Sequence, residues 1–474
     1  MKFADYKLGY ADAARELLLE PDIFKDAFYD PFNNVDKLLN SWKFMLVGRK
    51  GVGKSAYCSK IQYIAKKQGI INAFVVQLDD FEYATFSKAS CDSMVEGTKK
   101  YLDAWNFLIL LQVYKILYGV ITEVPEFTEM IELLEKIGFS VKTTFKSNVV
   151  SISKLKVGGN VGVFDAECEM EIGQKPLSFT ERLGWITNRM ISVLEKTYIN
   201  TRLYLLIDGV DDLLRLKKNQ VEILSSLIRS VNKLNTIFVE KKINIKNIIF
   251  LREDILAKAS DPDINKIKRD GSIPLSWSSD TDDLKKIANL RLGLSSDNTV
   301  DNLFAGSYDS KQPWDAILEH TLYKPRDILE FLRTCQTLYP NEEKLTVSQI
   351  RKALKKYSSD YFIEEMKNEL SGYVSDEIIA IVPTIFQKIG SNRFTTSSIV
   401  DAVKPSFGKN RTVETDVRQL LLVLFEAGYI GQLVKTNRNT DSVVFKYRNP
   451  TASIDYSQSF LIHRGIQKGL GVII

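Results

Sequence analysis

The sequence is poor in cysteine and histidine. Its four cysteines are widely separated and include no C-x-x-C pair. They are Cys58, Cys91, Cys168 and Cys335. This pattern indicates neither a zinc site nor a disulfide framework, and it fits a reducing compartment. The two histidines, His320 and His463, are too far apart in the sequence to suggest a metal site or an acid–base pair.

A long apolar run is also missing. The longest one, Trp105 to Ile121, is interrupted by Gln112 and Lys115 and falls short of a comfortable membrane span. We therefore predict a buried amphipathic helix there, with membrane contact as the alternative. The first residues, MKFADYKLGYADAARELLLE, carry acidic side chains and no apolar h-region. No secretory signal is expected, and a cytoplasmic location without membrane partners is predicted.

No nuclease, protease or deaminase motif occurs in the chain. Its 474 residues, 45% of them apolar, are enough for two or three globular domains. The net charge of +5 permits contact with nucleic acid but does not predict it, because solvated lysines explain this excess equally well.

One short motif carries strong functional information. The segment GRKGVGKS, residues 48–55, matches G-x-x-x-x-G-K-[ST] and lies between an apolar β-rich run and a predicted helix. In such a loop the backbone N–H groups surround a di- or triphosphate. The glycines are expected to permit positive φ and close backbone approach, Lys54 to bridge the β- and γ-phosphates, and Ser55 to bind magnesium. The candidate nucleotide-binding residues are Gly48, Arg49, Lys50, Gly51, Val52, Gly53, Lys54, Ser55 and Ala56.

A second motif supplies carboxylates. The apolar run 204–207 reads as a buried strand that ends in Asp208, a candidate ligand of Mg²⁺ together with Ser55. Asp211 or Asp212 is a candidate for polarising the attacking water, since Gly209 supplies no base. The aspartates at positions 79 and 80 also follow a predicted strand, so one of them could face the site, but we favour their interpretation as solvated turn residues.

Arginines complete the candidate catalytic set. Arg252 follows the buried strand within 243–256 and is placed to sense the γ-phosphate, with a surface pair to Asp254 as the alternative. Arg326 comes just after Pro325, where a lid helix is predicted to begin, although Asp327 also fits a plain capping role. Arg269 and Arg291 are weak candidates for an arginine supplied to a neighbouring subunit.

The chain is predicted to contain four parts. Residues 1–42 are helical, and 43–310 form an α/β P-loop NTPase core, a parallel sheet with flanking helices. This core carries an insertion at about 88–175, in which 148–173 alternate like a β-hairpin around a Gly-Gly-Asn turn. A helical lid at 311–371 precedes a winged helix and a C-terminal tail at 372–474.

The predicted winged helix has basic residues that suit phosphate contacts. They are Arg411, Arg418, Lys435, Arg438, Lys446 and Arg448. DNA is therefore a candidate partner. Its third helix is dominated by core residues, however, and many winged helices bind protein instead.

Several motifs of the chain, taken together, resemble those of known ATPase families. The motifs are GRKGVGKSA (48–56), LLIDGVDDL (205–213), FLREDIL (250–256) and YKPRDI (323–328), followed by the predicted winged helix. The chain resembles the signal-transduction ATPases with numerous domains (STAND) and related AAA+-like ATPases. It looks more like a bacterial family of stand-alone P-loop ATPases often found near phage-defence or DNA-repair genes.

This resemblance implies a sheet of order 5-1-4-3-2, a helical lid and control of oligomerisation by nucleotide. By similarity Lys54 and Ser55 match the Walker A pair, and Asp208 the Walker B aspartate. Arg252 matches the sensor-1 position, and Arg326 the residue after the lid proline. No Asp-Glu pair ends the acidic strand, which puts fast turnover in doubt, and the lid motif reads KPR where relatives often have a glycine two residues before the proline.

The leading hypothesis is an ATP- and Mg²⁺-dependent switch with slow ATPase activity, which assembles with itself or with an effector protein, in antiphage defence. ATP is favoured over GTP because no N-K-x-D motif follows a strand. The alternatives are a DNA-stimulated ATPase in DNA repair, a small-molecule or nucleotide kinase, and an interaction module that binds nucleotide without hydrolysis.

Overall fold

The computed structural model describes most of the chain and divides it into two compact units. Described are residues 1–69, 71–78, 81, 83–89, 101–121, 124–157, 178–210, 218–259, 262–277, 281–295, 297–406, 413–435 and 440–472. We call Phe32–Arg49 with Lys54–Leu275 the core unit. The C-terminal unit comprises Met1–Pro31, Lys50–Gly53 and Ser276–Ile474. The middle of the GRKGVGKS loop thus groups with the C-terminal unit, and both of its ends group with the core unit.

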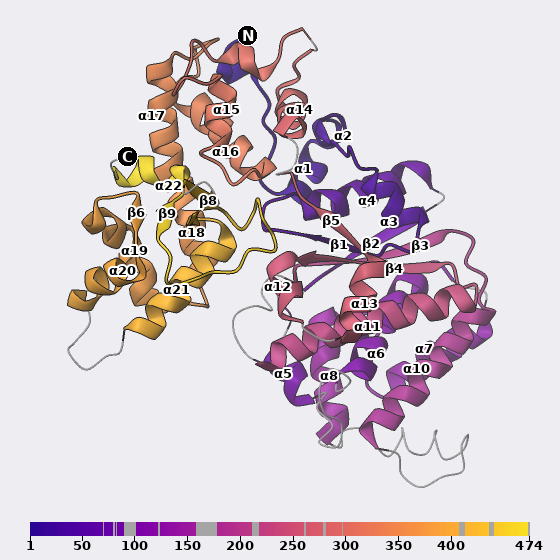
Figure 1. Ribbon diagram of the computed structural model, residues 1–474. Helices are drawn as coiled ribbons and strands as arrows, with labels where there is room; N and C mark the ends of the chain where they lie inside the picture. Colours follow the sequence, from indigo (N-terminus) through magenta and orange to yellow (C-terminus); the bar gives the residue numbers. More distant parts are fainter. Residues whose placement is uncertain are drawn as a thin grey trace. The chain divides into compact units, whose positions relative to one another are not determined.

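The core unit is built on a parallel sheet of five strands (Figure 1). These are β1 (Met45–Gly48), β2 (Ile71–Gln77), β3 (Arg202–Asp208), β4 (Ile245–Arg252) and β5 (Ser272–Leu275). Their order is β2-β3-β4-β1-β5, with every neighbouring pair parallel. The expected order 5-1-4-3-2 is confirmed. Strands β1, β3 and β4 are buried and fall on short continuous apolar runs, as expected of strands covered on both faces, whereas β2, at the edge of the sheet, is half-exposed.

Helices cover both faces of this sheet. Figure 1 shows α4 (Lys54–Gln68) on one side, and α6 (Leu102–Tyr118), α10 (Phe179–Lys196) and α11 (Lys218–Glu240) on the other. The side chains of β3 alternate accordingly: Leu203 and Leu205 join the large apolar cluster formed with α6, α10 and α11, while Tyr204 faces the other way. The shorter helices of this unit are α3 (Asn34–Asn40), α5 (Tyr83–Ala89), α7 (Pro125–Lys136), α12 (Glu253–Lys258) and α13 (Pro262–Gly271).

Most of the longest apolar run lies in helix α6, which is buried as predicted. It is not amphipathic, because every residue from 104 to 114 is buried. Its Trp105 indole N–H donates to the Ile223 carbonyl at 3.0 Å, and the Tyr114 hydroxyl donates to the Met190 carbonyl at 2.8 Å. Among the helices of the described ranges, none combines the length and the apolar character needed to cross a bilayer.

The prediction of a strand for the first arm of the β-hairpin is wrong. Residues up to 157 belong to helix α8 (Phe145–Val157). Val149 and Ile152 are fully buried, and with Phe145 they have the i, i+4, i+7 spacing of one helical face, which packs on α5 and α6. The apolar residues that suggested an alternating strand fit this helical spacing equally well. The predicted turn and second arm lie outside the described residues.

The C-terminal unit begins with short helices, α1 (Ala13–Leu19) and α2 (Pro21–Ala27), and α2 packs on α14 (Thr281–Leu292). A helical region follows, with α15 (Pro313–Leu318), α16 (Pro325–Leu338), α17 (Val347–Tyr357) and α18 (Ile363–Leu370). A π-helical turn, Ser358–Phe362, joins α17 to α18.

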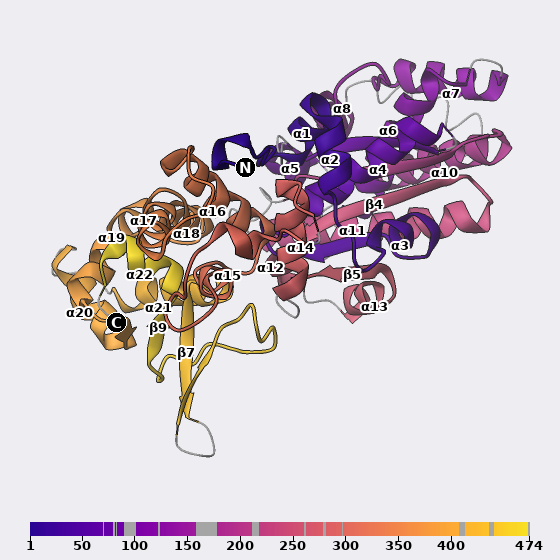
Figure 2. The ribbon, with the colours of Figure 1, turned by 90° about the horizontal axis from the view of Figure 1, so that it is seen from above.

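The last part of the unit combines helices with an antiparallel sheet. The helices are α19 (Asp376–Ile389), α20 (Thr396–Val403), α21 (Glu414–Ala427) and α22 (Arg464–Leu470). The strands are β6 (Arg393–Phe394), β7 (Ile430–Lys435), β8 (Asp441–Val444) and β9 (Phe460–Ile462), in the order β6-β9-β7-β8. Figure 2 shows the neighbouring strands β7 and β9. The sequence indicated a winged helix here, and within that stretch the structure has helices α19, α20 and α21, with the Thr395 side chain capping α20, and the antiparallel β7–β8 pair. Sequence analysis missed β6, β9 and α22.

Candidate functional site

The GRKGVGKS segment adopts a loop between β1 and α4. Gly51 and Gly53 have φ of +82° and +103°, a backbone conformation that a side chain would strain. This agrees with the expectation for these glycines. Gly48 differs, because it is the last residue of β1 and lies in extended backbone. We call residues 48–55 the phosphate loop and Lys50–Gly53 its tip.

Lys54 begins α4 and turns back toward the start of the loop. Its side chain is 7% exposed, and its Nζ donates to the carbonyls of Gly48 at 3.1 Å and Arg49 at 3.2 Å. Ser55 is exposed, and Ala56 is half-buried. A buried cation at the N-terminus of a long helix, beside a glycine-rich loop, is a combination that attracts phosphate.

The carboxyl ends of neighbouring strands bring further candidates to the same edge of the sheet. Gly48 of β1 is in register with Arg252 of β4, and β3 ends on the same edge at Asp208. The Asp208 carboxylate is 8% exposed and accepts from the Gly209 N–H at 2.9 Å. Strand β3 also contacts α4. The pKa of the Cys58 thiol on α4 is raised by burial and then by the charge of Asp208. The candidate water-activating residues Asp211 and Asp212, and the aspartates at 79 and 80, lie outside the described residues.

Arg252 forms the pair that the sequence offered as its alternative role. Its guanidinium donates twice to the Asp254 carboxylate, at 3.0 and 2.9 Å. The arginine is 11% exposed and Asp254 is 35% exposed, so the pair lies partly in solvent. A ligand that engages Arg252 has to compete with this bidentate contact.

The described residues contain no group of three or more His, Cys, Asp or Glu side chains that could hold a metal ion. The magnesium prediction therefore depends on two oxygen donors, the Ser55 hydroxyl and the Asp208 carboxylate. Hard oxygen donors in small number suit Mg²⁺, which keeps several waters and binds substrate phosphates.

Within the C-terminal unit, the loop tip is held by side chains from distant positions. The Trp277 indole N–H donates to the Val52 carbonyl at 2.9 Å. The Lys50 ammonium lies 3.3 Å from the Glu365 carboxylate. A Cβ added to Gly51 would meet the side chains of Lys324 and Arg326, at 3.4 and 3.5 Å. Sequence analysis anticipated Arg326 but missed Trp277, Lys324 and Glu365.

The helix that was predicted to serve as a lid begins at the expected position. Pro325 is the first residue of α16, and Arg326 follows it against the loop tip. The buried Asp327 carboxylate accepts from the Leu322 N–H at 2.8 Å and from the Tyr361 hydroxyl at 3.0 Å. Asp327 therefore fixes the turn before α16 as well as the π-helical turn, a role wider than capping.

The two candidates for an arginine supplied in trans have contacts within their own units. Arg291 forms an ion pair with Glu16, which is fully buried. The Arg269 carbonyl accepts from the Lys43 ammonium at 3.3 Å. Arg291 thus serves the packing of the N-terminal helices in this structure.

Several basic residues near the C-terminus also have intramolecular partners. Arg418 donates to Glu414 at 2.9 Å, and Lys446 lies 3.5 Å from Glu426. Arg448 donates to the Tyr323 hydroxyl at 2.9 Å. Lys435 is exposed on β7. The other two candidates, Arg411 and Arg438, lie outside the described residues.

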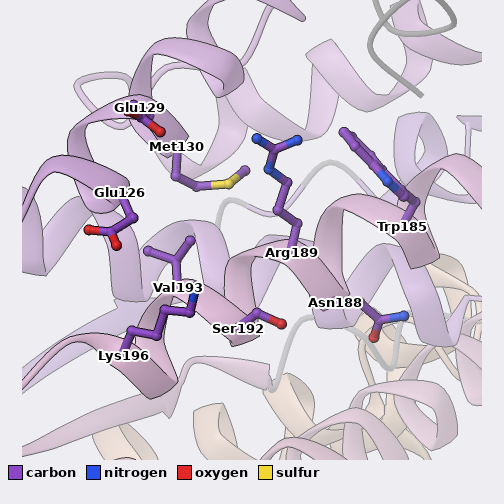
Figure 3. A pocket seen from close by; sticks show the side chains of 9 residues that line it. All are labelled: Glu126, Glu129, Met130, Trp185, Asn188, Arg189, Ser192, Val193 and Lys196. Carbon is purple, nitrogen blue, oxygen red and sulfur yellow. The ribbon is translucent and has the colours of Figure 1, made fainter. Parts of the chain in front are cut away.

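A separate pocket of about 440 Å³ lies between α7 and α10 (Figure 3). Its α7 side carries Glu126 and Glu129, and its α10 side carries Arg189 and Lys196. The Arg189 guanidinium lies 5.5 Å from the ring centroid of Trp185. None of the predicted site residues lines it.

Comparisons with known proteins give two similarities. Residues 282–364 match the family model of the FunZ-associated C-terminal helical domain, a stretch that runs from α14 into the start of α18. No curated protein matches the chain. Among solved structures, the chain is similar to Cdc6p from Pyrobaculum aerophilum at 13% sequence identity, with 96% of this chain and 98% of that chain covered. The TM-score of that pair is 0.28, so it carries no argument about function.

Proposed function

We propose that this protein is a STAND/AAA+-like switch that binds ATP and hydrolyses it slowly. Its nucleotide state would control assembly with itself or with an effector protein. The observation that carries the proposal is the phosphate loop: Gly51 and Gly53 have positive φ, and the buried Lys54 begins α4 beside them. A role in antiphage defence rests on the resemblance of the sequence motifs alone.

The proposed chemistry divides between the two ends of the loop and the neighbouring strand. Lys54 would leave the Gly48 and Arg49 carbonyls and place its charge on the β- and γ-phosphates. Asp208 and Ser55 would hold magnesium, which neutralises charge on the departing phosphate when it is bound. Gly209 follows Asp208 where a second acid would polarise water, and this supports slow turnover.

Coupling to assembly is supported by the division of the loop. The tip contacts Trp277, Arg326 and Glu365 in the C-terminal unit. Phosphates that reshape the loop would therefore alter contacts inside that unit. The C-terminal helices and strands are in turn proposed to form a winged helix that engages the partner.

The experiment measures ATP turnover and particle mass on the same protein samples, with Mg²⁺ and with or without ATP. We expect slow hydrolysis and a larger particle with ATP for the wild type, and neither for Lys54→Ala. Lys66→Ala is the matched control, because Lys66 is an exposed lysine on the same helix. The variant with both Asp211→Asn and Asp212→Asn should hold ATP and keep the larger particle.

Two outcomes would contradict the proposal. Binding without hydrolysis or change in mass would indicate the non-hydrolysing interaction module. Equal behaviour of Lys54→Ala and the wild type would remove the phosphate loop from the mechanism altogether.

A further inference from the structure

An acidic side chain faces the tip of the phosphate loop. The Glu365 carboxylate of α18 lies 3.3 Å from the Lys50 ammonium, and the two side chains are 23% and 24% exposed. A loop that binds phosphate gains from every nearby positive charge. Glu365 offsets the charge of Lys50, so this contact opposes the binding of an anion at the loop.

Glu365 is held in place by the elements around it. The π-helical turn Ser358–Phe362 leads directly into α18. Within it, the Tyr361 hydroxyl donates to Asp327 at 3.0 Å. π-Helical turns are rare and occur frequently at functional sites.

The same turn is anchored to the end of the chain. Ser358 donates from its hydroxyl to the Gly465 carbonyl and accepts from the Gly469 N–H at 2.9 Å. A Cβ on Gly465 or Gly469 would lie closer than 3 Å to side chains of this region, namely 2.6 Å from Phe362 and 2.6 Å from Ser358. Helix α22 thus packs directly on the segment that positions Glu365.

We propose that Glu365 is a positioning residue that restrains the phosphate loop through Lys50, and that nucleotide phosphates compete with Glu365 for this lysine. The inference rests on the proposed function, because it names the regulation of the same loop. Release of Glu365 by nucleotide would be transmitted to α22 through the π-helical turn. The restraint makes nucleotide binding weaker than the loop alone would allow.

The proposal predicts the direction in which ATP affinity changes when Glu365 loses its charge. Glu365→Gln keeps the size of the side chain and removes its charge, so Lys50 becomes available to phosphate. We expect this variant to bind ATP about three- to fivefold more tightly than the wild type, as for a partly exposed ion pair. A residue that only supported the fold would change affinity in the opposite direction when altered.

Two further variants isolate the contact. Glu364→Gln removes the same charge from the neighbouring position, where Glu364 pairs with Lys367 at 2.7 Å on the same helix. It should leave ATP affinity unchanged. In the Lys50→Gln background, Glu365→Gln should no longer raise affinity, because the double-mutant cycle removes both partners.

The measurement is calorimetric titration of the full chain with ATP and Mg²⁺, at low and raised salt. The gain from Glu365→Gln should shrink as salt screens the loop. If the wild type binds ATP but Glu365→Gln binds no more tightly than Glu364→Gln, the restraint is refuted and the proposed function stands. If neither the wild type nor any variant binds ATP, both are overturned.

Discussion

Two buried lysines of the core unit have the same local arrangement and different surroundings. Lys54 and Lys246 are each 7% exposed, and each donates to two backbone carbonyls. The acceptors of Lys54 belong to the start of the phosphate loop. Those of Lys246 belong to the C-terminal end of α3, where the Tyr204 hydroxyl also donates to the Leu39 carbonyl at 3.0 Å.

The difference shows that burial of a lysine does not by itself indicate a ligand site. The carbonyls at a helix C-terminus carry partial negative charge and lack intrahelical partners, so Lys246 completes α3 and leaves nothing for an anion to bind. Lys54 lies at a helix N-terminus, where free N–H groups can share an anion with it. The glycines of the loop, with their positive φ, allow that exchange.

The largest expected effect comes from removing the lysine of the loop. Lys54→Met should weaken ATP binding about 100-fold, since charged hydrogen bonds to phosphate each contribute about 1.5–3 kcal/mol. The free energy of unfolding without nucleotide should change little, because the loop carbonyls can turn to water. Titration with a fluorescent ATP analogue measures the first quantity and urea unfolding the second. Comparable losses of affinity in Lys54→Met and Lys66→Met would show that Lys54 has no special role in binding ATP.

For Lys246 we expect a loss of stability and no loss of ATP affinity. Lys246→Met leaves buried carbonyls of α3 without a donor, so unfolding should require about 1–3 kcal/mol less than in the wild type. ATP affinity should stay within the error of the titration. A loss of affinity without a loss of stability would show that Lys246 acts on the ligand.

Stability should also depend on pH in a way that identifies Lys246. Burial, aided by the charge of Arg202, lowers the pKa of Lys246 from 10.5 to about 7. Between these values the unfolded chain binds a proton that the folded chain does not. The wild type should therefore gain stability relative to Lys246→Met as pH rises from 7 toward 10, by at most about 1.4 kcal/mol per pH unit. Urea unfolding of both proteins at several pH values measures this slope, and parallel curves would contradict it.

The sequence predicted the sheet and the base of the loop because both depend on contiguous residues. An apolar run such as that ending in Asp208 specifies a buried strand, and the spacing of Gly51, Gly53 and Lys54 specifies the loop. The prediction of a hairpin strand failed where the apolar residues fit both the spacing of a strand and that of a helix. Val149 and Ile152 are compatible with either structure, and their packing on α5 and α6 stabilises the helix.

The contacts of the loop tip could not be predicted from the sequence. Trp277 and Glu365 lie more than 200 residues after the loop, and neither belongs to a recognisable motif. Trp277 follows β5 in the sequence and stacks on Tyr29, and Glu365 lies on α18, so both contacts depend on tertiary packing. Lys246 was missed for the same reason, because its acceptors come from α3.

A smaller effect on ATP affinity is expected at the Val52 carbonyl of the loop tip. The Val52 carbonyl accepts from the Trp277 indole, whose ring stacks on Tyr29 at a centroid distance of 6.5 Å. Trp277→Phe keeps an aromatic ring and removes the donor. We expect ATP affinity to fall about fivefold, in line with about 1 kcal/mol for one hydrogen bond. Tyr29→Phe, which removes a hydroxyl bonded to Asp283 at 2.9 Å, is the control and should have less effect. Equal effects would assign the loss to the aromatic pair and not to the loop carbonyl.

The smallest effect is expected from DNA. Cations that serve as internal partners, as Lys246 does, are poorly available to phosphate, and Arg418, Lys446 and Arg448 all have such partners. We expect duplex DNA to leave ATP turnover unchanged at moderate salt. Glu414→Gln, which removes the carboxylate partner of Arg418 and leaves its contact with the Tyr456 ring, should add weak, salt-sensitive binding of DNA, since one phosphate contact contributes a slope of about 0.9 in the logarithm of affinity against salt. Stimulation of the wild type that weakens steeply with salt would contradict this expectation and would favour the alternative of a DNA-stimulated ATPase.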